Sequence, residues 1–468
     1  RGCRARGAMA PKVIAAPGAL PRYPGAFSIL SFNVLLPNSM DGWWMYKMYA
    51  PGALLDPEEA SWPRRAALIR EEIRAAGADV VCLQEVCPES FETDFAFMED
   101  LGYTGKEMFR KGRFRPATFW RPSVELTASA HRDRALVSMF KLAGAEGRPP
   151  CAVVNCHLQA GPEGARRLRQ AHEALEFVFK AAKKAGHPDP ARAPCVVAGD
   201  LNGDERSAAV ALLERGEVGP DFLEDGEAVT SKPKKSPFPP MVDASAAASE
   251  EREPPATLVV ADLIPLLTEG GDEGRSTRIS AGAAARLREV FADRAGPDGV
   301  MRADQVSAWL VTVNGALGRG SEFRAACAEM AASCPGAPAE VSPAPAEAPA
   351  EAAPAEAAPR TLPPDGFLTA DAFVRIYEKE LRAGKYWGVA HDLQALGRPL
   401  PEFGRLGLFK ARFDRVYASA GTRVLAVRDR TSDAPCPNAA HASDHLPVGA
   451  VVEVLPLPSA AGSEGTAR

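Results

Sequence analysis

Short apolar runs alternate with amphipathic segments over the first 200 residues of the chain. Runs of this length, bounded by polar residues, are typical of buried strands. After Ser28, for example, the run to Leu36 is broken only by Ser31 and Asn33. On this pattern we expect strands at Ser28–Leu36, Asp79–Glu85, Ala117–Arg121, Ala135–Leu142, Ala152–Leu158 and Cys195–Gly199.

Helical segments separate these strands. The first has Ser61 as a helix N-cap, Pro63 in its first turn and Gly77 as a C-cap. Two more helices are expected at Pro88–Leu101 and Gly164–Ala185. Strands that alternate with helices, with hairpin-like pairs between them, favour an α/β fold with mixed sheets. The apolar side of the first helix is expected to consist of Ala66, Leu68, Ile69 and Ile73.

The pattern changes from about Gly226. Ser231–Pro255 has no periodicity and is expected to be a loop. Cys334–Pro359 repeats Ala-Pro-Ala-Glu units, which bury too little apolar area to fold. Helices are expected at Ala281–Ala292, Ala303–Val313 and Thr369–Ala383, and strands resume at Arg415–Ala418, Arg423–Arg428 and Leu446–Leu455.

These patterns predict one catalytic domain that is split by an insertion. Residues 25–225 and 391–456 would form the α/β domain, and residues 226–390 the insertion, with a linker at 333–360. Residues 1–24 would be an N-terminal extension and residues 457–468 a flexible tail. The linker accounts for a good part of the high proline content, 42 residues in 468.

Composition narrows the class of protein. Nine cysteines spread over so long a chain favour a reducing compartment, which predicts an intracellular protein of the cytoplasm or nucleus. No apolar run approaches the length of a membrane helix, so we expect no stable membrane insertion. The chain opens at Arg1 and its first methionine is Met9, so it is either a fragment or starts at Met9. Organellar targeting stays open.

Charge is distributed unevenly along the chain. The net charge is −5, and residues 226–386 alone contribute −6. Residues 101–200 contain 17 basic and 9 acidic side chains. The whole-chain charge therefore says little against a polyanionic substrate of the catalytic domain.

Polar residues stand where several predicted strands end, inside one apolar strand (Asn33), or just before a strand (Asp444 and His445). They are Asn33, Glu85, His157, Asp200, Asn202, Asp444 and His445, with Asp414 as a further candidate. Each alone has an ordinary structural explanation, such as a cap, a turn or a solvated strand end. Together, acids, amides and imidazoles at strand ends suit a divalent-metal phosphoesterase, which needs oxygen ligands for Mg²⁺ and donors for phosphoryl oxygens.

The ordered set SFNVL, LQEV, NCHL, GDLN and SDHLP resembles the endonuclease/exonuclease/phosphatase superfamily. The resemblance covers about residues 25–225 and 395–456. It implies a four-layer α/β/β/α sandwich of two mixed β-sheets and in-line hydrolysis of a phosphoester without a covalent intermediate. It also implies Mg²⁺ as the cofactor, with Mn²⁺ as a substitute.

The resemblance further implies a role for each matching residue. Glu85 would be the principal Mg²⁺ ligand, with Asn33 beside it, and Asp444 would complete the metal or water network. Asp200 would orient or deprotonate the attacking water. Asn202 would steady the nucleophile or the pentacovalent phosphorus.

The remaining roles concern the phosphate group. His445 would donate to a non-bridging phosphate oxygen, with Asp414 as its orienting carboxylate. His157 would be a second phosphate donor.

Two departures from the family pattern leave the branch of the family open. Arg115-Pro116 stands where a glycine is common, and Asp414-Arg415 replaces the usual Asp-Tyr pair. RFDRVY resembles the tyrosyl-DNA phosphodiesterase branch, whereas the opening NVLLPNSMDGWWMYKMY is closer to the deadenylase-like branch.

A basic and aromatic segment, Tyr103–Arg121, falls between the motifs. It predicts either a strip that holds phosphates and stacks bases, or a surface hairpin whose aromatics pack inward. Three arginines after His157 could also reach a phosphate, although a solvated helical face explains at least two of them. They are Arg166, Arg167 and Arg169.

Two segments of the insertion resemble EF-hands. Asp298 and Asp365 would take loop position five, each followed by glycine, and Met301 and Leu368 the hydrophobic eighth position. The other ligand positions are poor, since Arg294 or Thr361 stands at position one and Gln305 or Ala372 at position twelve. Ca²⁺ binding at Asp298 and Asp365 is therefore weighed against a degenerate helical pair. Calcium-binding plant and algal members of the superfamily show a similar architecture.

The sequence thus predicts a Mg²⁺-dependent phosphodiesterase or nuclease that acts on nucleic acid and carries an EF-hand-like insertion, through which calcium would modulate it. One alternative is hydrolysis of a small or lipid phosphoester, such as an inositol phosphate or sphingomyelin. A second alternative is a non-catalytic calcium-sensing adaptor. The filled catalytic positions argue against the adaptor.

Overall fold

The computed structural model describes residues 13–15, 18–36, 61–109, 115–248, 253–269, 278–318, 320–334, 361–400 and 406–457. Several predicted features lie outside these residues. They are most of the N-terminal extension, the second part of the NVLLPNSMDGWWMYKMY segment, the Pro/Ala/Glu-rich linker and nearly all of the tail.

Strands from both ends of the chain form the first sheet. Its seven strands lie in the order β1 (Ile14–Ala15), β20 (Thr422–Asp429), β21 (Val448–Val454), β2 (Ala26–Asn33), β3 (Val80–Val86), β5 (Arg115–Trp120) and β4 (Gly105–Met108). The sheet is mixed, because β2 runs parallel to β3 and antiparallel to β21.

The second sheet is also mixed. Its six strands lie in the order β14 (Val242–Asp243), β19 (Asp414–Ala418), β9 (Cys195–Asp200), β8 (Cys151–His157), β7 (Ala135–Leu142) and β6 (Val124–Arg132). β8 and β9 run parallel, whereas β9 and β19 run antiparallel. The sequence pattern predicted both ends of β7 correctly. It missed β6, in which most side chains are only partly buried or exposed.

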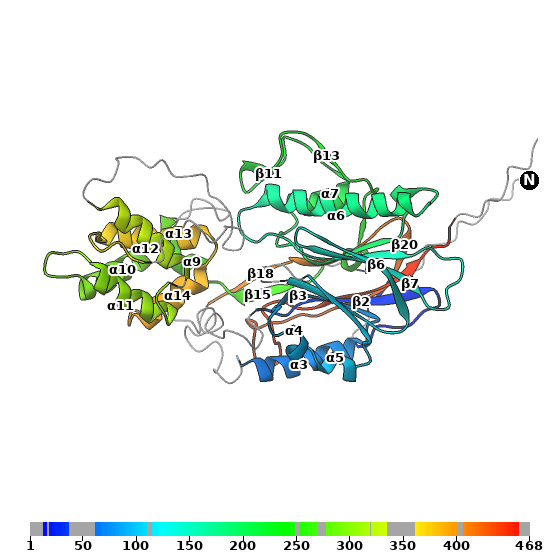
Figure 1. The fold of residues 1–468 in the computed structure, drawn as a ribbon, viewed down its shortest axis with the longest axis horizontal. Coiled ribbons are helices and arrows are strands. Elements are labelled where there is room, and N and C mark those ends of the chain that lie inside the picture. Colours follow the sequence, from blue (N-terminus) through cyan, green and yellow to red (C-terminus); the bar gives the residue numbers. More distant parts are fainter. Residues whose placement is uncertain are drawn as a thin grey trace, which may run out of the picture.

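Helices cover the outer face of each sheet (Figure 1). Helices α3 (Trp62–Ala76), α4 (Phe91–Asp94) and α5 (Phe97–Asp100) pack on the first sheet, and α6 (Gly164–Lys184) and α7 (Ala208–Arg215) pack on the second. A third apolar core, which includes Ile29, Val80, Val153 and Val416, fills the space between the sheets. The predicted four-layer α/β/β/α sandwich is therefore confirmed.

Local sequence explains the ends of α3. Ser61 occupies the N-cap position, Pro63 stands in the first turn, and Gly77 ends the helix with a left-handed φ of 62°. Glycine adopts this conformation without the steric cost that a Cβ atom would add.

Two secondary-structure predictions need correction. The helix expected at Pro88–Leu101 is two short helices, α4 and α5, and the break comes at Phe95, whose ring packs against Trp62, Phe91 and Phe119. The loop expected at Ser231–Pro255 contains β13 (Lys234–Lys235), β14 and helix α8 (Ala244–Ala248). β13 pairs with β10 (Glu217–Val218), and β14 pairs with β19. Short elements of this kind are fixed by their partners and leave no periodicity in the sequence.

A separate group of helices lies between two strands that pair with each other. β15 (Leu258–Ala261) and β18 (Leu408–Ala411) form an antiparallel two-stranded ribbon, called here the ribbon. The described residues between Asp262 and Gly407 are called the helical module. Its helices are α9 (Ile264–Leu267), α10 (Ala281–Arg294), α11 (Ala303–Asn314), α12 (Gly320–Ala332), α13 (Ala370–Arg382) and α14 (Tyr386–Ala395).

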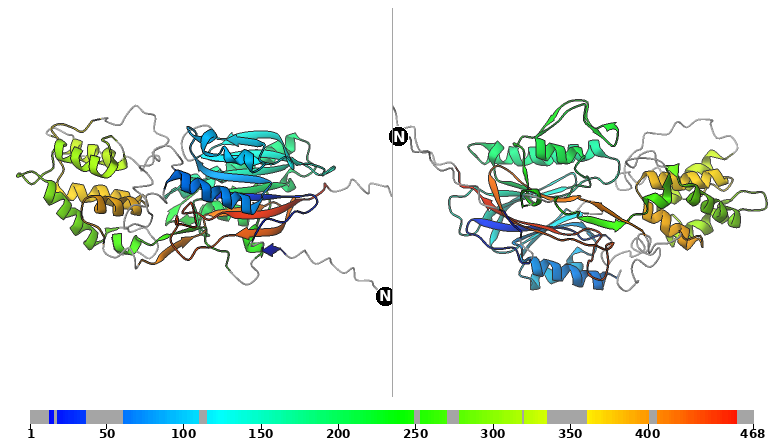
Figure 2. Two further views of the ribbon diagram at one scale, coloured as in Figure 1. Left: turned by 90° about the horizontal axis from the view of Figure 1, so that it is seen from below. Right: turned by 180° about the vertical axis from the view of Figure 1, so that it is seen from behind.

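The helical module has its own apolar core, in which Trp309, Phe373 and Tyr377 are fully buried. It lies beside the two sheets at one end of the molecule (Figures 1 and 2). Met301 and Leu368 form an isolated antiparallel bridge between its two turns, with backbone hydrogen bonds of 3.0 and 2.8 Å. Residue 226, the predicted start of the insertion, precedes β14. Because β14 pairs with β19, it belongs to the second sheet.

No helix in the described parts of the chain is long and apolar enough to cross a membrane.

Candidate active site

Polar side chains meet at one edge of the two sheets. Asn33 ends β2, His157 ends β8 and Asp200 ends β9, while Asp414 begins β19. The registers pair His157 with Asp200 and Asp200 with Asp414, so these residues lie side by side. The structure brings together all eight residues that the strand ends predicted, namely Asn33, Glu85, His157, Asp200, Asn202, Asp414, Asp444 and His445. Their roles stay predictions.

Asn33 links the two sheets at this edge. Its Nδ2 donates to Oδ2 of Asp200 at 3.0 Å and to Oε1 of Glu85 at 3.3 Å. Nε2 of His157 lies 3.7 Å from each of the same two carboxylates. One amide and one imidazole therefore stand between two acids that belong to different sheets.

His445 and Asp414 form the shortest contact between two side chains of the predicted site residues. Nδ1 of His445 lies 2.7 Å from Oδ2 of Asp414, and its Nε2 lies 3.8 Å from Oδ2 of Asp200. Burial lowers the pKa of His445, but Asp414, Asp200 and Asp444 raise it more, so the pKa lies well above its usual value. The raised pKa favours the protonated imidazole, which can donate from Nε2.

Two site residues have a strained backbone. Glu85 has a φ of 62° and Asn202 a φ of 49°, both in the left-handed region that side chains other than glycine rarely adopt. The backbone N–H of Asn202 donates to Oδ1 of Asp200 at 2.7 Å, and its Nδ2 donates to the carbonyl of Leu158 at 2.9 Å. Such strain persists where the surrounding structure fixes it, and it clusters at functional sites.

Gly199 allows β8 and β9 to approach just before Asp200. Its φ is 146°, and a Cβ atom there would lie 2.0 Å from the carbonyl oxygen of Cys156. Glycine is therefore required at this position, where it sets the end of β9 and with it the place of Asp200.

The site carries an excess of negative charge, which suits a divalent cation. Burial and the nearby Asp444 raise the pKa of Glu85 to about 7. Oδ1 of Asp414 is buried and accepts no hydrogen bond from a described residue. Ligand atoms of Asp200, Asp414 and His445 lie within 4.8 Å of one another, the one such group of three in the described chain. Carboxylate oxygens of this kind are the ligands that Mg²⁺ prefers.

Arg65 is a site residue that the sequence pattern did not reveal. The buried residues of α3 are Arg65, Ile69, Ile73 and Ala76, which include Ile69 and Ile73 of the predicted apolar side. Leu68 is partly buried against the same core. The guanidinium of Arg65 donates to the carbonyls of Val34, Leu35 and Ala442. Arg65 therefore ties the loop after Asn33 to the loop before Asp444. An arginine beside Arg64 on an amphipathic helix carries no signal that separates it from a solvated one.

Three further polar residues support the edge. Ser443 is fully buried, and its Oγ donates to the carbonyl of Asn33 at 2.7 Å. Gln84 Nε2 donates to Asn155 Oδ1 at 2.9 Å, and Asn155 Nδ2 donates to the carbonyl of Ala117 at 2.9 Å. A buried amide in an otherwise apolar strand was the signal that could have identified Asn155.

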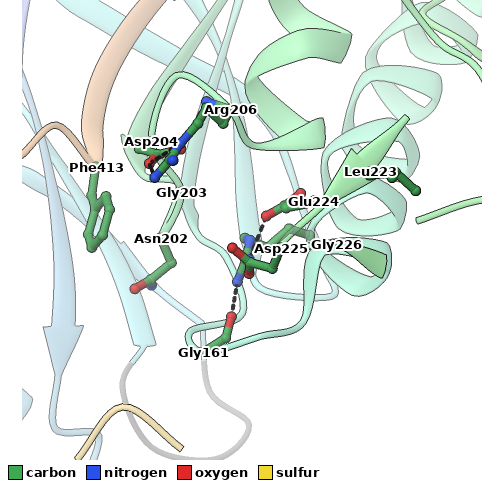
Figure 3. A pocket seen from close by; sticks show the side chains of 11 residues that line it. Gly161, Asn202, Gly203, Asp204, Arg206, Leu223, Glu224, Asp225, Gly226 and Phe413 are labelled. Atoms are coloured by element: carbon green, nitrogen blue, oxygen red, sulfur yellow. Dashed lines mark hydrogen bonds and ion pairs between the residues drawn. The ribbon is translucent and has the colours of Figure 1, made fainter. Parts of the chain in front are cut away.

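A cavity of about 620 Å³ opens next to Asn202. Figure 3 shows Phe413 and Asn202 on one side of it and Glu224 and Asp225 on the other. Its charged side chains are largely paired, since Arg206 contacts Asp204 at 2.9 Å and Arg167 contacts Glu224 at 2.6 Å. The aromatic ring in its lining is that of Phe413, one residue before Asp414, and Leu223 also lines the cavity.

The described parts of the basic and aromatic segment after Tyr103 contain β4 and β5, which pair antiparallel, and residues 110–114 lie outside the described residues. The hydroxyl of Tyr103 donates to the carbonyl of Ala78, and the ring of Phe119 is buried against Phe91. These aromatics pack inward, as the second alternative for this segment predicted. Arg115 begins β5 opposite Val86, with its guanidinium 5.3 Å from the ring centroid of Phe109.

Two of the three arginines after His157 are paired with acidic side chains. Arg167 is buried and pairs with Glu224, whereas Arg169 is exposed and lies 3.2 Å from Asp133. Both guanidiniums are engaged with acids of the chain, so neither is assigned to a phosphate.

Asp298 and Asp365 lie in the helical module and not at this edge. Asp298 Oδ2 accepts from Nη2 of Arg302 at 2.7 Å. Calcium binding by these residues stays a prediction.

Comparison with known proteins identifies the family of this chain. A family model described as the endonuclease/exonuclease/phosphatase family matches residues 30–445. Protein angel homolog 2 of Bos taurus is 26% identical over 223 residues, which cover 43% of this chain and 39% of that protein. Its counterpart from Homo sapiens is 26% identical over 222 residues, with the same coverage. The match therefore spans well under half the length of these curated relatives.

The solved structures that align with this chain include ANGEL2, a 2′,3′-cyclic phosphatase, in complex with adenosine-2′,3′-vanadate. It has a TM-score of 0.47 and 16% identity, covering 92% of this chain and 97% of that one. Truncated TDP2 of Caenorhabditis elegans has a TM-score of 0.40 and 12% identity, covering 92% and 98%. Because the family model spans most of the chain, the protein belongs to the endonuclease/exonuclease/phosphatase family.

Proposed function

We propose that this protein is a divalent-metal-dependent phosphodiesterase that acts on nucleic acid. The observation that carries the proposal is the convergence of Glu85, Asp200, Asp414 and His445 at one edge of the two sheets, with Asn33 and His157 between the acids. Hydrolysis of a phosphoester needs a bound cation, an oriented water and donors for the phosphoryl oxygens, and this set supplies residues for each.

Glu85 and Asn33 would hold Mg²⁺ or Mn²⁺. The raised pKa of Glu85 indicates a carboxylate whose charge lacks compensation, which a cation would supply. The group Asp200, Asp414 and His445 is the alternative holder. We favour Glu85, because the His445 ring is already engaged by Asp414 and Mg²⁺ prefers oxygen ligands. When bound, the cation would polarise the phosphoryl group and stabilise its developing charge.

The remaining residues would act on the water and the phosphate. Oδ2 of Asp200 lies at the centre of the site, within 4 Å of Asn33, His157 and His445, so this carboxylate would accept the proton of an attacking water. His445, held protonated by Asp414, would donate from Nε2 to a non-bridging oxygen. Asn202 would fix the water or the phosphate through the turn that follows Asp200.

A nucleic acid substrate is supported by the cavity beside Asn202. It extends the site away from the scissile phosphate and offers the ring of Phe413 together with hydrogen-bonding groups, a combination that suits a nucleobase. The basic excess of residues 101–200 favours a polyanion. A small or lipid phosphoester is the alternative substrate class.

A substrate panel tests the proposal. It consists of poly(A) RNA, single-stranded DNA, a 5′-phosphotyrosyl oligonucleotide, RNA ending in a 2′,3′-cyclic phosphate, an inositol phosphate and sphingomyelin, each with Mg²⁺ or with EDTA. We expect metal-dependent cleavage of at least one nucleic acid and none by Glu85→Gln. Activity confined to sphingomyelin or inositol phosphate would contradict the substrate class. Inactivity toward all of them, and toward bis(p-nitrophenyl) phosphate, would leave the adaptor as the explanation.

Calcium modulation is the further part of the proposal. Its support is the bridge between Met301 and Leu368, which joins the two turns that carry Asp298 and Asp365. Asp298 would have to leave Arg302 to bind an ion. Isothermal titration of the intact chain with Ca²⁺, beside the double variant Asp298→Ala, Asp365→Ala, decides this. Heat in the wild type alone supports binding, and equal traces exclude it.

A further inference from the structure

Thr257 lies at the base of the ribbon, just before β15, and only 3% of it is exposed. Its Oγ1 accepts hydrogen bonds from two consecutive backbone N–H groups, those of Phe413 at 3.0 Å and Asp414 at 2.9 Å. Its own N–H donates to the carbonyl of Ala411 at 2.9 Å, and its carbonyl accepts from the N–H of Leu446 at 2.6 Å. Thr257 therefore contacts both the backbone segment that carries Asp414 and the segment that follows His445.

The next residues of the ribbon continue this contact. Leu258 forms a β-bridge with His445, and the N–H of Val259 donates to the carbonyl of Asp444 at 3.2 Å. The backbone that carries His445 is thus paired with one side of β15, while β18 pairs with the other side. Asp414 follows β18 by three residues, so both members of the pair are held by the same short strand.

The hydroxyl oxygen of Thr257 accepts both N–H groups at the start of β19. Asp414 presents its carboxylate to His445 across 2.7 Å, a distance that depends on where its backbone stands. If the oxygen is removed, two buried N–H groups lose their partner and the segment must shift to find another. A shift of a few tenths of an ångström at Asp414 changes the orientation of the imidazole, and rates fall steeply with such displacements.

We propose that Thr257 is a positioning residue that holds Asp414 and the His445 loop in the geometry that the reaction requires. This inference rests on the proposed function, because it assigns the pair to phosphoester hydrolysis. It adds a residue outside the strand-end motifs. It also makes the ribbon, which leads into the helical module, part of the support of the site (Figure 1).

Two variants separate the hydroxyl from the methyl group. Thr257→Val keeps the shape and removes the acceptor, whereas Thr257→Ser keeps the acceptor. With the substrate that the wild type cleaves best, we expect kcat of Thr257→Val to fall at least about tenfold with KM changed less than about twofold. Thr257→Ser should stay within about twofold of the wild type in both constants. Thr268→Val, which removes a hydroxyl that donates to Ile264 within the helical module, should leave both unchanged.

Hydrogen exchange supplies a readout that needs no substrate. The amides of Phe413 and Asp414 should exchange faster in Thr257→Val than in the wild type and in Thr257→Ser. Should Thr257→Val fail to fold in a circular dichroism melt, Thr257→Ala removes the same oxygen without adding a methyl group and replaces it in the comparison.

Wild-type kcat and unchanged exchange in the variant without the oxygen would overturn the inference. So would an equal loss in Thr257→Ser and Thr257→Val, because the methyl group would then carry the effect. An inactive wild type would overturn the proposed function and this inference together, whereas an active wild type with an equally active Thr257→Val overturns the inference alone.

Discussion

His445 and Asp414 are 31 positions apart in the sequence, yet Nδ1 of His445 lies 2.7 Å from Oδ2 of Asp414. Both side chains are buried, and the carboxylate of Asp414 holds the imidazole so that its Nε2 points toward Asp200. The relationship arises because β19 and β21 both begin at the same edge of two facing sheets.

Asp414→Asn should therefore lower kcat about 100-fold or more while KM changes little. The amide can neither stabilise the imidazolium nor hold it in the same orientation. Steady-state kinetics on the best substrate measure this. Asp433→Asn changes an exposed aspartate in the loop between β20 and β21. It is the matched control and should behave as the wild type. A fall of less than threefold in Asp414→Asn would contradict the role of the pair.

Glu85→Gln should abolish Mg²⁺ binding and activity. In the wild type, Mg²⁺ should raise the melting temperature, because a ligand that binds only the folded state stabilises it. The raised pKa of Glu85, about 7, adds a pH dependence. Protonation competes with the cation, so affinity should fall as the pH drops below about 7 and rise to a plateau above it.

Calorimetric titration with Mg²⁺ between pH 5.5 and 8.5 measures this dependence. Glu92→Gln, an exposed glutamate on α4, should bind like the wild type. If Asp414→Asn loses the metal and Glu85→Gln retains it, the ion belongs to Asp200, Asp414 and His445 instead.

Phe413→Leu should raise KM for an oligonucleotide about fivefold or more, because a base that stacks on an aromatic ring gains on the order of 1–3 kcal/mol. The constants for bis(p-nitrophenyl) phosphate, which has no base, should stay within about twofold. Phe367→Leu, in the helical module, is the matched control. An equal loss on both substrates would show that Phe413 acts through Asp414 and does not bind a base.

Gly199→Ala should lower the free energy of unfolding by about 3 kcal/mol or more. The added Cβ would lie 2.0 Å from the Cys156 carbonyl, and a φ of 146° is unfavourable for alanine. Gly282→Ala in α10 is the control, because a Cβ there would meet no described atom within 4 Å. It should be neutral or stabilise by up to about 1 kcal/mol. Urea unfolding compares the two, and equal effects would contradict the close approach.

Asp243→Asn should destabilise the protein by about 3 kcal/mol at pH 7, because it leaves Arg412 buried without its partner. Burial raises the pKa of Asp243, but hydrogen bonds from Arg412 outweigh it and the pKa lies below its usual value. The stabilisation is therefore complete above about pH 4 and is lost as the pH falls through the lower folded-state pKa.

Unfolding curves between pH 2 and pH 7 should show that the wild type and Asp243→Asn converge in acid. Asp100→Asn breaks an exposed pair with Arg70 and should cost less than about 1 kcal/mol at any pH. A constant difference between the curves of the wild type and Asp243→Asn would show that the pair does not titrate on unfolding.

The sequence alone was sufficient for the α/β class, for most strands and for the eight residues at the candidate site. Apolar runs report burial on both faces of a sheet, and a polar residue that ends such a run stands where the sheet stops. Asn33, His157 and Asp200 followed from this local rule. Ser61, Pro63 and Gly77 likewise marked α3 through backbone preferences that act over a few residues.

Only the tertiary structure decided which residues support the site. Arg65 and Thr257 carry no local signal, because their importance comes from carbonyls and N–H groups far away in the chain. The pKa of Glu85 depends on Asp444, which reaches it through the pairing of β2 with β21 and with β3. Periodicity records whether a residue is buried, whereas strand register fixes its neighbours, and those neighbours determine charge and geometry at this edge.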